Sequence, residues 1–411
     1  MSDIRFEGWL HRSGTGGVYQ DSAGNVGIAS TQPQQKLDIG NGGFQVGPTG
    51  IATVTTINTT NIINATPLSN RNIIINGAMT VSQRGTSFTD NGDVNANAYT
   101  LDRFKSERDT DGAATITQSG TSPDGFTSSL KYDITTADTS LAASQYAQIT
   151  YKVEARDLRH LAYGTSAAKT ITLSFYVRSN KTGNYNFVYE QEDNGNKLSS
   201  HQYTINSADT WERKVITTTG DTAGVINNDG GAGFKMKWGL AYGSTFSSGS
   251  VTNGWSAQNN ANFGAGQGVN LFDSTSNEWY LTGVQLEIGS VATPFEHRSF
   301  ADELRRCQRY FYKNTDSPVG MFVPDAADTD QAYGFVRFPV PMRGAPTVIL
   351  SDNNGNTDGK VTQHGAAHNI AATASQIQKE GFARCTNTSS TWNVTASRPI
   401  VCGVTTATAE L

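Results

Sequence analysis

Cysteine is scarce in this chain: Cys307, Cys385 and Cys402 are the three among 411 residues. An odd number of cysteines cannot pair completely within one chain, and no CxxC motif or Cys/His cluster accompanies them. The sequence therefore predicts a fold made in a reducing cytoplasm that does not depend on disulfides. Cys307 and Cys402 lie in apolar patterns, so we expect both to be small buried residues.

Charged residues are also few, at 16%, and the formal net charge is −5. Without a basic stripe to neutralise phosphates, nucleic acid is not expected as a partner. No apolar run approaches the length that spans a bilayer, so membrane insertion is not expected either. The N-terminus lacks a basic region followed by an apolar segment, which predicts no classical export signal.

Motifs that carry catalysis or bind cofactors are missing as well. The sequence has no HExxH, no GxSxG and no GxxxxGK[ST]. Asp325, Asp328 and Asp330 are spaced loosely like calcium ligands but do not match the calcium-loop pattern, and a solvated loop is the simpler interpretation. We therefore expect no metal, no cofactor and no enzyme activity. A glycan-cleaving enzyme with a carboxylate pair that sequence cannot reveal stays open as an alternative.

What the chain has instead is glycine, with 42 residues, and long stretches rich in Thr, Ser and Asn. Together with short apolar alternations, this composition predicts an all-β protein with many turns. In residues 1–70 the apolar residues come in short pairs, which are two apart in Val26–Ile28, Leu37–Ile39 and Phe44–Val46 and three apart in Ile51–Val54. One copy of such a segment cannot bury enough surface to order itself, so we expect several copies to intertwine in a shaft or anchor. A flexible polar linker is the alternative.

Residues 71–296 read as one jelly-roll β-sandwich. Turn signals such as Asp111-Gly112 separate the strand candidates. The expected strands are Arg71–Ile75, Ala113–Gln118, Gln145–Val153, Lys169–Arg178, Tyr185–Glu190, His201–Ile205, Glu212–Thr217, Phe234–Tyr242 and Glu278–Ile288. A short helical turn is expected at Ala155–Leu161.

The last expected strand passes directly into the most convincing helix of the chain. Ser299 lies three residues before Asp302, like a capping box, and Phe300, Leu304, Cys307 and Phe311 then recur at helical spacing. We expect a linking helix over 297–313, packed where copies of the chain meet. Residues 314–411 contain further apolar alternations and are expected to form a C-terminal β domain.

These segments resemble a widespread module of bacteriophage tail fibres. RNIIINGAMTVSQRG, TITLSFYVRSNKTGNYNF and WYLTGVQLEIGSVATPFEHRSFADELRRCQRYFYK match it in the same order from about residue 71 to residue 313, and NVGIASTQPQQKLDIG is similar to segments of trimeric fibre proteins. The module itself resembles the jelly rolls of carbohydrate-binding modules. The resemblance implies a virion protein of the tail, made in the host cytoplasm and released by lysis, that forms a homotrimer. It also implies an N-terminal segment that attaches to other virion tail proteins and distal domains that meet a host surface glycan.

Candidate glycan contacts are aromatic or planar polar side chains that the strand alternation turns away from the core. Ile171, Leu173, Phe175 and Val177 define one core face, and Trp238 is expected in the core with Phe234 and Met236. The predicted binding set is Trp255, Trp279, Tyr176, Arg178 and Gln285, of which Trp255 lies in a loop. Each could instead pack under a loop or in a subunit interface.

Three functions are open at this point. The first is a tail-fibre or receptor-binding protein that recognises a host glycan without cleaving it. The second is a virion structural protein without a ligand, such as a head fibre, decoration protein or tail connector. The third is a glycan depolymerase. Fold class does not separate them, because function depends on the site.

Overall fold

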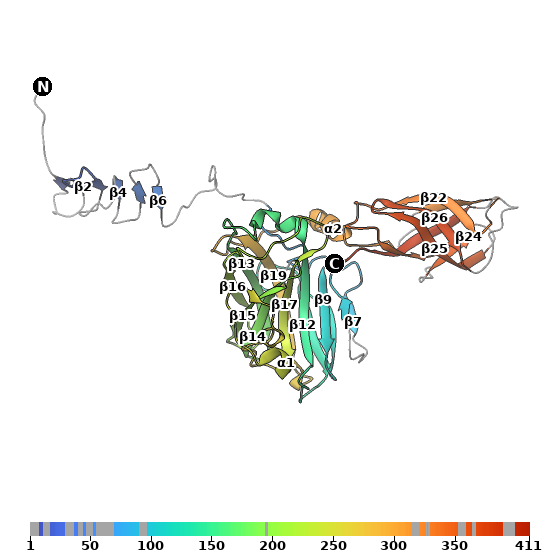
Figure 1. The fold of residues 1–411 in the computed structure, drawn as a ribbon, viewed down its shortest axis with the longest axis horizontal. Helices are drawn as coiled ribbons and strands as arrows, with labels where there is room; N and C mark the ends of the chain where they lie inside the picture. Colours follow the sequence, from blue (N-terminus) through green and yellow to red (C-terminus); the bar gives the residue numbers. More distant parts are fainter. Residues whose placement is uncertain are drawn as a thin grey trace, which may run out of the picture. The chain divides into compact units, whose positions relative to one another are not determined.

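The computed structural model divides the chain into two compact units, residues 1–68 and 69–411. Figure 1 shows the fold and labels many of its strands and helices. The structure describes residues 8–10, 17–28, 37–39, 44–46, 52–54, 70–89, 97–193, 196–314, 320–325, 327, 329–351, 359–363, 367–388 and 399–411. Among these residues no helix has the length and hydrophobicity of a membrane span.

The first unit is a six-stranded sheet in sequence order, with strands of three or four residues. Its strands are β1 (Gly8–Leu10), β2 (Gly17–Gln20), β3 (Val26–Ile28), β4 (Leu37–Ile39), β5 (Phe44–Val46) and β6 (Ala52–Val54). The expected apolar pairs Val26–Ile28, Leu37–Ile39 and Phe44–Val46 therefore lie in strands. Val54 of the fourth pair lies in β6, and Ile51 is outside the described residues. Val18 and Ile28 face each other in the ladder, and more than a third of each residue stays exposed.

Two antiparallel sheets form the sandwich in the second unit, and Figure 1 labels most of their strands. The β13 sheet has the order β16 (Glu212–Thr218), β13 (Ile171–Ser179), β19 (Glu278–Ile288), β11 (Ser129–Thr136), β10 (Ala113–Ser119) and β7 (Ser87–Thr89). The β17 sheet has the order β18 (Ser256–Ala257), β15 (Lys197–Ile205), β14 (Gly183–Gln191), β17 (Ala232–Tyr242), β12 (Tyr146–Glu154), β9 (Phe104–Asp109) and β8 (Asn97–Tyr99). The expected all-β class with a sandwich is confirmed.

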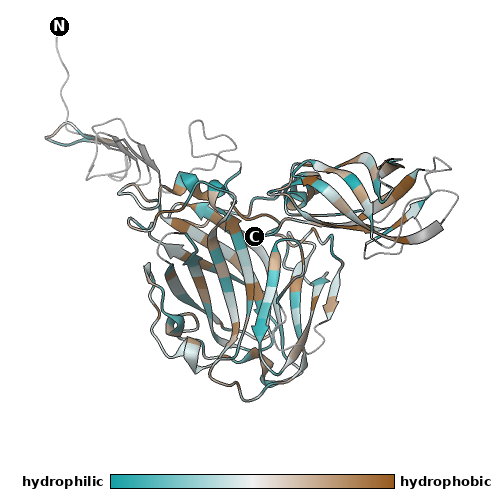
Figure 2. Cartoon of the chain, turned by 45° about the vertical axis from the view of Figure 1, so that its right-hand side comes forward, coloured by the Kyte–Doolittle hydropathy of each residue, from teal (hydrophilic) through white to brown (hydrophobic). Residues whose placement is uncertain are grey.

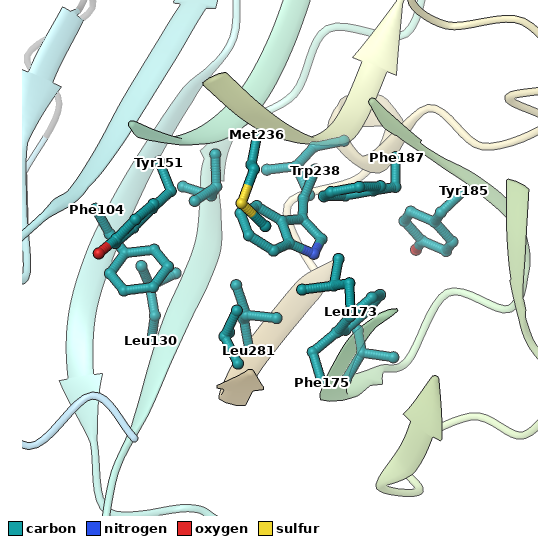
Figure 3. Close-up of a cluster of buried hydrophobic side chains, with 14 of the residues drawn as sticks. Phe104, Leu130, Tyr151, Leu173, Phe175, Tyr185, Phe187, Met236, Trp238 and Leu281 are labelled. Carbon is teal, nitrogen blue, oxygen red and sulfur yellow. The ribbon is translucent and has the colours of Figure 1, made fainter. Parts of the chain in front are cut away.

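The core of the sandwich lies between these sheets and is shown in Figure 3. Trp238 is fully buried, as expected, and its ring lies 6.0 Å from that of Phe175 across the core and 5.1 Å from that of Phe187. Polar and apolar bands alternate along the strands in Figure 2. Burial of the apolar half of each strand is the main contribution to the stability of this unit.

One alternation was misread from the sequence, that of β19. Trp279 was expected to face away from the core, but it is fully buried inside it together with Leu281. At Gly283, where φ is +61°, the phase changes, because Gly283 and Val284 stand opposite the single residue Phe175 of β13. Such a β-bulge shifts the side-chain alternation by one residue, so Val284 and Leu286 also point inward.

Several expected boundaries also change. Residues 71–75 form no ladder, although the Ile73 N–H donates a 2.9 Å hydrogen bond to the Leu286 carbonyl. Strands β7, β8, β9, β11 and β18 were not expected. The short helical turn is confirmed as a 3-10 helix, η1 (Ala155–Leu161). The observed sandwich strands otherwise overlap the expected ones.

The linking helix is shorter than the expected 297–313 range. Helix α2 covers Phe300–Gln308, and Ser299 caps it by accepting a 3.2 Å hydrogen bond from the Asp302 N–H. Its apolar stripe is uneven, because Cys307 is buried against Ile75, Val81 and Tyr310 while Phe300 is 60% exposed. Phe311 was expected on the helix but begins strand β20 (Phe311–Asn314).

The C-terminal residues form a separate β core. Six strands close on themselves in the order β27, β21, β22, β26, β25 and β24, because β24 pairs with β27. Their bounds are β21 (Gly320–Pro324), β22 (Gln331–Arg337), β24 (Lys360–Gln363), β25 (Ala367–Gln378), β26 (Gly381–Asn387) and β27 (Ile400–Thr408). The far half of β27 pairs with β20 and with β23 (Thr347–Ser351). Cys385 and Cys402 are free and buried here, as Cys307 is elsewhere, so the expected burial of Cys307 and Cys402 is confirmed.

The division of the chain at 70/71, 296/297 and 313/314 stays a prediction, as does the intertwining of copies. The loop at 352–358 and Asp328 lie outside the described residues.

Candidate functional site

The outer face of the β17 sheet carries a row of polar side chains. Along β12 the inward residues Ile149 and Tyr151 belong to the core, which turns Gln148 and Thr150 outward. The ladder places Gln148 beside Glu107 of β9. On the other side it places Thr150 beside Lys237 of β17. Strand alternation therefore gathers residues from three strands on one surface.

A loop from residue 243 to residue 268 covers the neighbouring part of this face. It contains helix α1 (Ser244–Ser247), strand β18 and the 3-10 helix η2 (Asn260–Asn262). Phe263 from this loop packs on Val188 and Leu198, which point outward from β14 and β15, and Phe246 packs against the same cluster. The loop thus forms an apolar wall beside the polar row.

Between the wall and the polar row lies a hollow of about 190 Å³. Its lining residues are Glu107, Tyr146, Gln148, Lys235, Lys237, Tyr242, Phe246 and Phe263. A concave site with aromatic walls and a few fixed polar groups is the usual form of a small-ligand site. We call this feature the groove.

Hydrogen bonds fix the polar floor of the groove. The Tyr242 hydroxyl donates to Gln148 Oε1 at 2.7 Å, and Gln148 Nε2 donates to Glu107 Oε2 at 2.9 Å. The Thr150 hydroxyl donates to the same Glu107 oxygen at 2.9 Å. All four of these residues are almost fully buried, so the protein fixes the orientation of their side chains before a ligand binds.

Each lysine of the groove has a carboxylate within 4 Å. Lys237 Nζ lies 2.8 Å from Glu190, and Lys235 Nζ lies 3.7 Å from Glu107. Lys105 Nζ lies 3.1 Å from Glu107 as well. The groove is therefore close to neutral, although it contains several charges.

The pKa values of these groups follow from that arrangement. Burial opposes ionisation of Glu107, but Lys235, the amide of Gln148 and the other donors outweigh it and lower its pKa to about 2. Burial lowers the pKa of Lys237, although the charge of Glu190 acts in the opposite direction by favouring the protonated lysine. Glu107 is accordingly a permanent hydrogen-bond acceptor at physiological pH.

Two polar groups of the groove have capacity left for a ligand. The ion pairs of Lys235 with Glu107 and Glu192 are 3.7 and 3.9 Å long, beyond hydrogen-bond range, so its N–H groups can donate to a ligand. The Tyr146 ring is half-buried and packs edge-on against Phe246 at 5.5 Å. Burial, with the charges of Glu107 and Asp109, raises the pKa of Tyr146, so its hydroxyl keeps its proton.

The residues predicted from the sequence do not form this groove. Trp279 is in the core, and Gln285 is fully buried, because it bonds Glu287 and the segment around Thr293 on the outer face of the β13 sheet. Neither side chain can touch a ligand in this structure, which corrects the predicted set. Tyr176 and Arg178 do face away from the core, and Arg178 is held by Asp209 and Glu278.

Trp255 also differs from a free loop residue. Its indole N–H donates to the Thr219 carbonyl at 2.9 Å, and its ring stacks on Phe234 at 5.6 Å. Trp255 therefore packs against the edge of the core. Packing of this kind was the alternative to glycan contact for each predicted residue. Glycan contact by Tyr176 and Arg178 stays a prediction.

A signal for the groove was present in the sequence but incomplete. Lys235 and Lys237 occupy the positions between the core residues Phe234, Met236 and Trp238, so alternation alone turns them outward. The sequence does not show that the loop over residues 243–268 folds over the same face. Without that wall, the outward residues look like an ordinary solvated surface.

Metal binding has no candidate in the part of the chain that the structure describes, where no group of three or more His, Cys, Asp or Glu residues converges.

Comparison with known proteins gives structural similarities only. No family model and no curated protein matches the sequence. The enzymatically active domain of tailspike protein 4 from bacteriophage CBA120 is similar over 53% of this chain and 22% of that chain, with 10% identity and a TM-score of 0.27. A family 11 carbohydrate-binding module of a Clostridium thermocellum cellulase is similar over 48% of this chain and 91% of its own, with 11% identity and a TM-score of 0.26. At these TM-scores the similarities carry no argument about function.

Proposed function

We propose that this protein binds an uncharged glycan in the groove of the β17 sheet. The observation that supports this most directly is the pairing of partly exposed aromatic rings with polar groups already fixed by hydrogen bonds. Tyr146 and Phe246 offer apolar faces for the C–H side of a sugar ring. Lys235 and the carboxylate of Glu107 offer a donor and an acceptor for its hydroxyls.

An uncharged glycan fits better than an acidic one. Each groove lysine is matched by a carboxylate, so an anionic sugar would find little net attraction and would meet the ionised Glu107. Binding should accordingly depend only weakly on ionic strength, because few charges are exchanged with salt.

Binding without cleavage is part of the proposal. A glycosidase needs a carboxylic acid that is protonated at working pH, which requires a raised pKa. The pKa of Glu107 moves in the opposite direction, to about 2. This supports a role for Glu107 in holding a ligand.

The biological setting that we propose is a phage tail fibre that carries the groove toward host surface glycans. Its support is the resemblance of residues 71–313 to tail-fibre modules. A homotrimer would make weak single-site binding effective, because three grooves on one particle act together. The short apolar strands of the first unit would attach to other tail proteins or to further copies.

The test is binding of the purified full chain to host cells and to extracted surface polysaccharide. We expect saturable binding that is retained in high salt, with no release of reducing ends. Tyr146→Ala and Lys235→Ala should each weaken binding by at least tenfold, since each removes a contact that no neighbour replaces.

Val215→Ala is the matched control, because Val215 is 50% exposed on the other sheet. Unchanged binding in both groove variants would show that the groove is not the site. Release of reducing ends would favour a depolymerase, and no binding to any glycan would favour a purely structural virion protein.

A further inference from the structure

The loop over residues 243–268 closes two adjoining sides of the groove. At the start of β12, the Phe246 ring lies 5.5 Å from the Tyr146 ring and 6.2 Å from the Tyr242 ring. Toward β14, Phe263 packs on Val188 in the same cluster as Phe246. A ligand that extends along the strands or across them therefore meets aromatic rings at one end.

An ion pair joins the loop to the sheet on the side toward β14. Lys237 Nζ lies 4.0 Å from the centre of the Phe263 ring and 2.8 Å from Glu190 Oε2. Gln258 of the loop donates a 2.9 Å hydrogen bond to Glu190 Oε1. These contacts block the path of a glycan chain on this side.

The end of the groove opposite Tyr146 is more exposed. The ladder places Lys235 beside Lys152 there, and Glu192 lies 3.9 Å from Lys235 and 3.4 Å from Lys152. The side chains of Lys152 and Glu192 are 20% and 32% exposed. We expect a bound chain to leave the groove at this end.

The groove is small for a site that holds an extended glycan. Its volume of about 190 Å³ is below the roughly 300–1,000 Å³ of pockets that enclose drug-sized ligands. It therefore has room for about one sugar ring, and the remainder of a longer chain has to lie outside it.

Three polar groups of the groove have unused hydrogen-bonding capacity. None of the hydrogen bonds between described residues involves the Tyr146 hydroxyl, and Lys235 has only its two long ion pairs there. Glu107 Oε1 accepts from Lys105 at 3.1 Å and, as a carboxylate oxygen, can accept once more. A terminal sugar matches these groups, because it uses one linkage and keeps its other hydroxyls free. A sugar within the chain gives at least one more hydroxyl to a second linkage.

We propose that the groove binds the terminal sugar of a glycan chain and does not bind sugars within the chain. The inference rests on the proposed glycan binding and adds which part of the glycan is recognised. Hydrogen bonding discriminates between the two, since a groove group that loses its hydroxyl partner stays unpaired in the complex. The closed sides exclude a second linkage by steric clash.

Counting the binding sites on a host polysaccharide tests this inference. Extracted surface polysaccharide is cut to several chain lengths with mild acid, and methylation analysis counts each kind of terminal sugar per gram, including those on branches. Calorimetric titration with the full chain then gives the number of protein chains bound per gram. We expect this number to equal that of one kind of terminal sugar and to increase with it. Sites that outnumber all terminal sugars, or stay constant as these increase, would overturn the inference and leave the proposed glycan binding intact.

Two variants show whether the counted sites belong to the groove. Tyr146→Ala should weaken binding by at least about tenfold, because its ring and hydroxyl both contact the terminal sugar. Val215→Ala, on the other sheet, should change neither the affinity nor the number of sites. Circular dichroism checks that both are folded. Wild-type affinity in Tyr146→Ala would place the counted sites outside the groove and overturn the inference, whereas a wild-type chain that binds no polysaccharide would overturn the proposed glycan binding with it.

Discussion

The Tyr242 hydroxyl donates a 2.7 Å hydrogen bond to Gln148 Oε1, which joins the end of β17 to the beginning of β12. The Tyr242 ring can lie there because it crosses Gly239 of its own strand, where an added Cβ would come within 2.3 Å of the ring. Gln148 in turn donates to Glu107 on β9. A glycine, a tyrosine and an amide thus set the floor of the groove together.

Gly239→Ala should therefore damage the groove. The new methyl group would push the Tyr242 ring aside and break its bond to Gln148, at a cost of about 1–3 kcal/mol in unfolding free energy. Glycan affinity, measured by calorimetric titration, should fall at least tenfold. Gly120→Ala is the control, since a Cβ there meets nothing within 4 Å and both properties should be unchanged. Full affinity in Gly239→Ala would mean that Tyr242 does not shape the site.

The two tryptophans Trp238 and Trp255 should differ in their effect on stability. Trp238 is fully buried between the sheets, so Trp238→Ala should lower the unfolding free energy by about 3–5 kcal/mol. Trp255 is only half-buried and packs on one side, so Trp255→Ala should cost less than half as much. Urea denaturation followed by circular dichroism measures both. Equal losses would contradict the packing described here.

A buried ion pair joins the last residues of the chain to the sandwich. Glu410 accepts from Arg103 and, at 3.0 Å, from Arg84, and the side chains of Glu410 and Arg103 are 5% and 1% exposed. Glu410→Ala leaves the Arg103 charge buried without its partner, which should cost about 3 kcal/mol.

Asp209→Asn is the comparison, because Asp209 forms an ion pair with Arg178 but its own side chain is 55% exposed. That change should cost less than about 1 kcal/mol. Thermal unfolding of both variants checks the difference, and a Glu410→Ala variant as stable as Asp209→Asn would show that Arg103 finds other compensation.

His201 should make the sandwich sensitive to acid. It is buried between Ser199 and Thr218, whose hydroxyls lie 2.9 Å from Nε2, and burial lowers its pKa to about 4. The unfolded chain, with a His pKa near 6.5, binds the proton more readily. The stability is thus complete above about pH 6.5 and is lost as the pH falls toward 4.

Between pH 7 and pH 5 this one group should account for a loss of about 2 kcal/mol in unfolding free energy. Urea denaturation at both pH values measures it in the wild type and in His201→Gln. The variant should lose about 2 kcal/mol less than the wild type over that interval. The same pH dependence in both proteins would assign the acid sensitivity to other groups.

Much of the fold could be predicted from local patterns. The alternation in residues 234–242 placed Trp238 in the core, and Ser299 marked the start of α2. These features depend on residues close in sequence, whose period and hydrogen bonding are set by backbone geometry. Strand β9 was missed, because its inward positions include Ser106 and Arg108 and so give a weak apolar signal.

The sequence by itself determined the all-β class, the scarcity of charge and the inward face of most strands. Tertiary structure decided what the outward faces become. The bulge at Gly283 turned Trp279 inward, residues near Thr293 buried Gln285, and the 243–268 loop made a groove beside Gln148. Each outcome depends on contacts between segments far apart in the chain, and the period of a single strand carries no information about what will cover it.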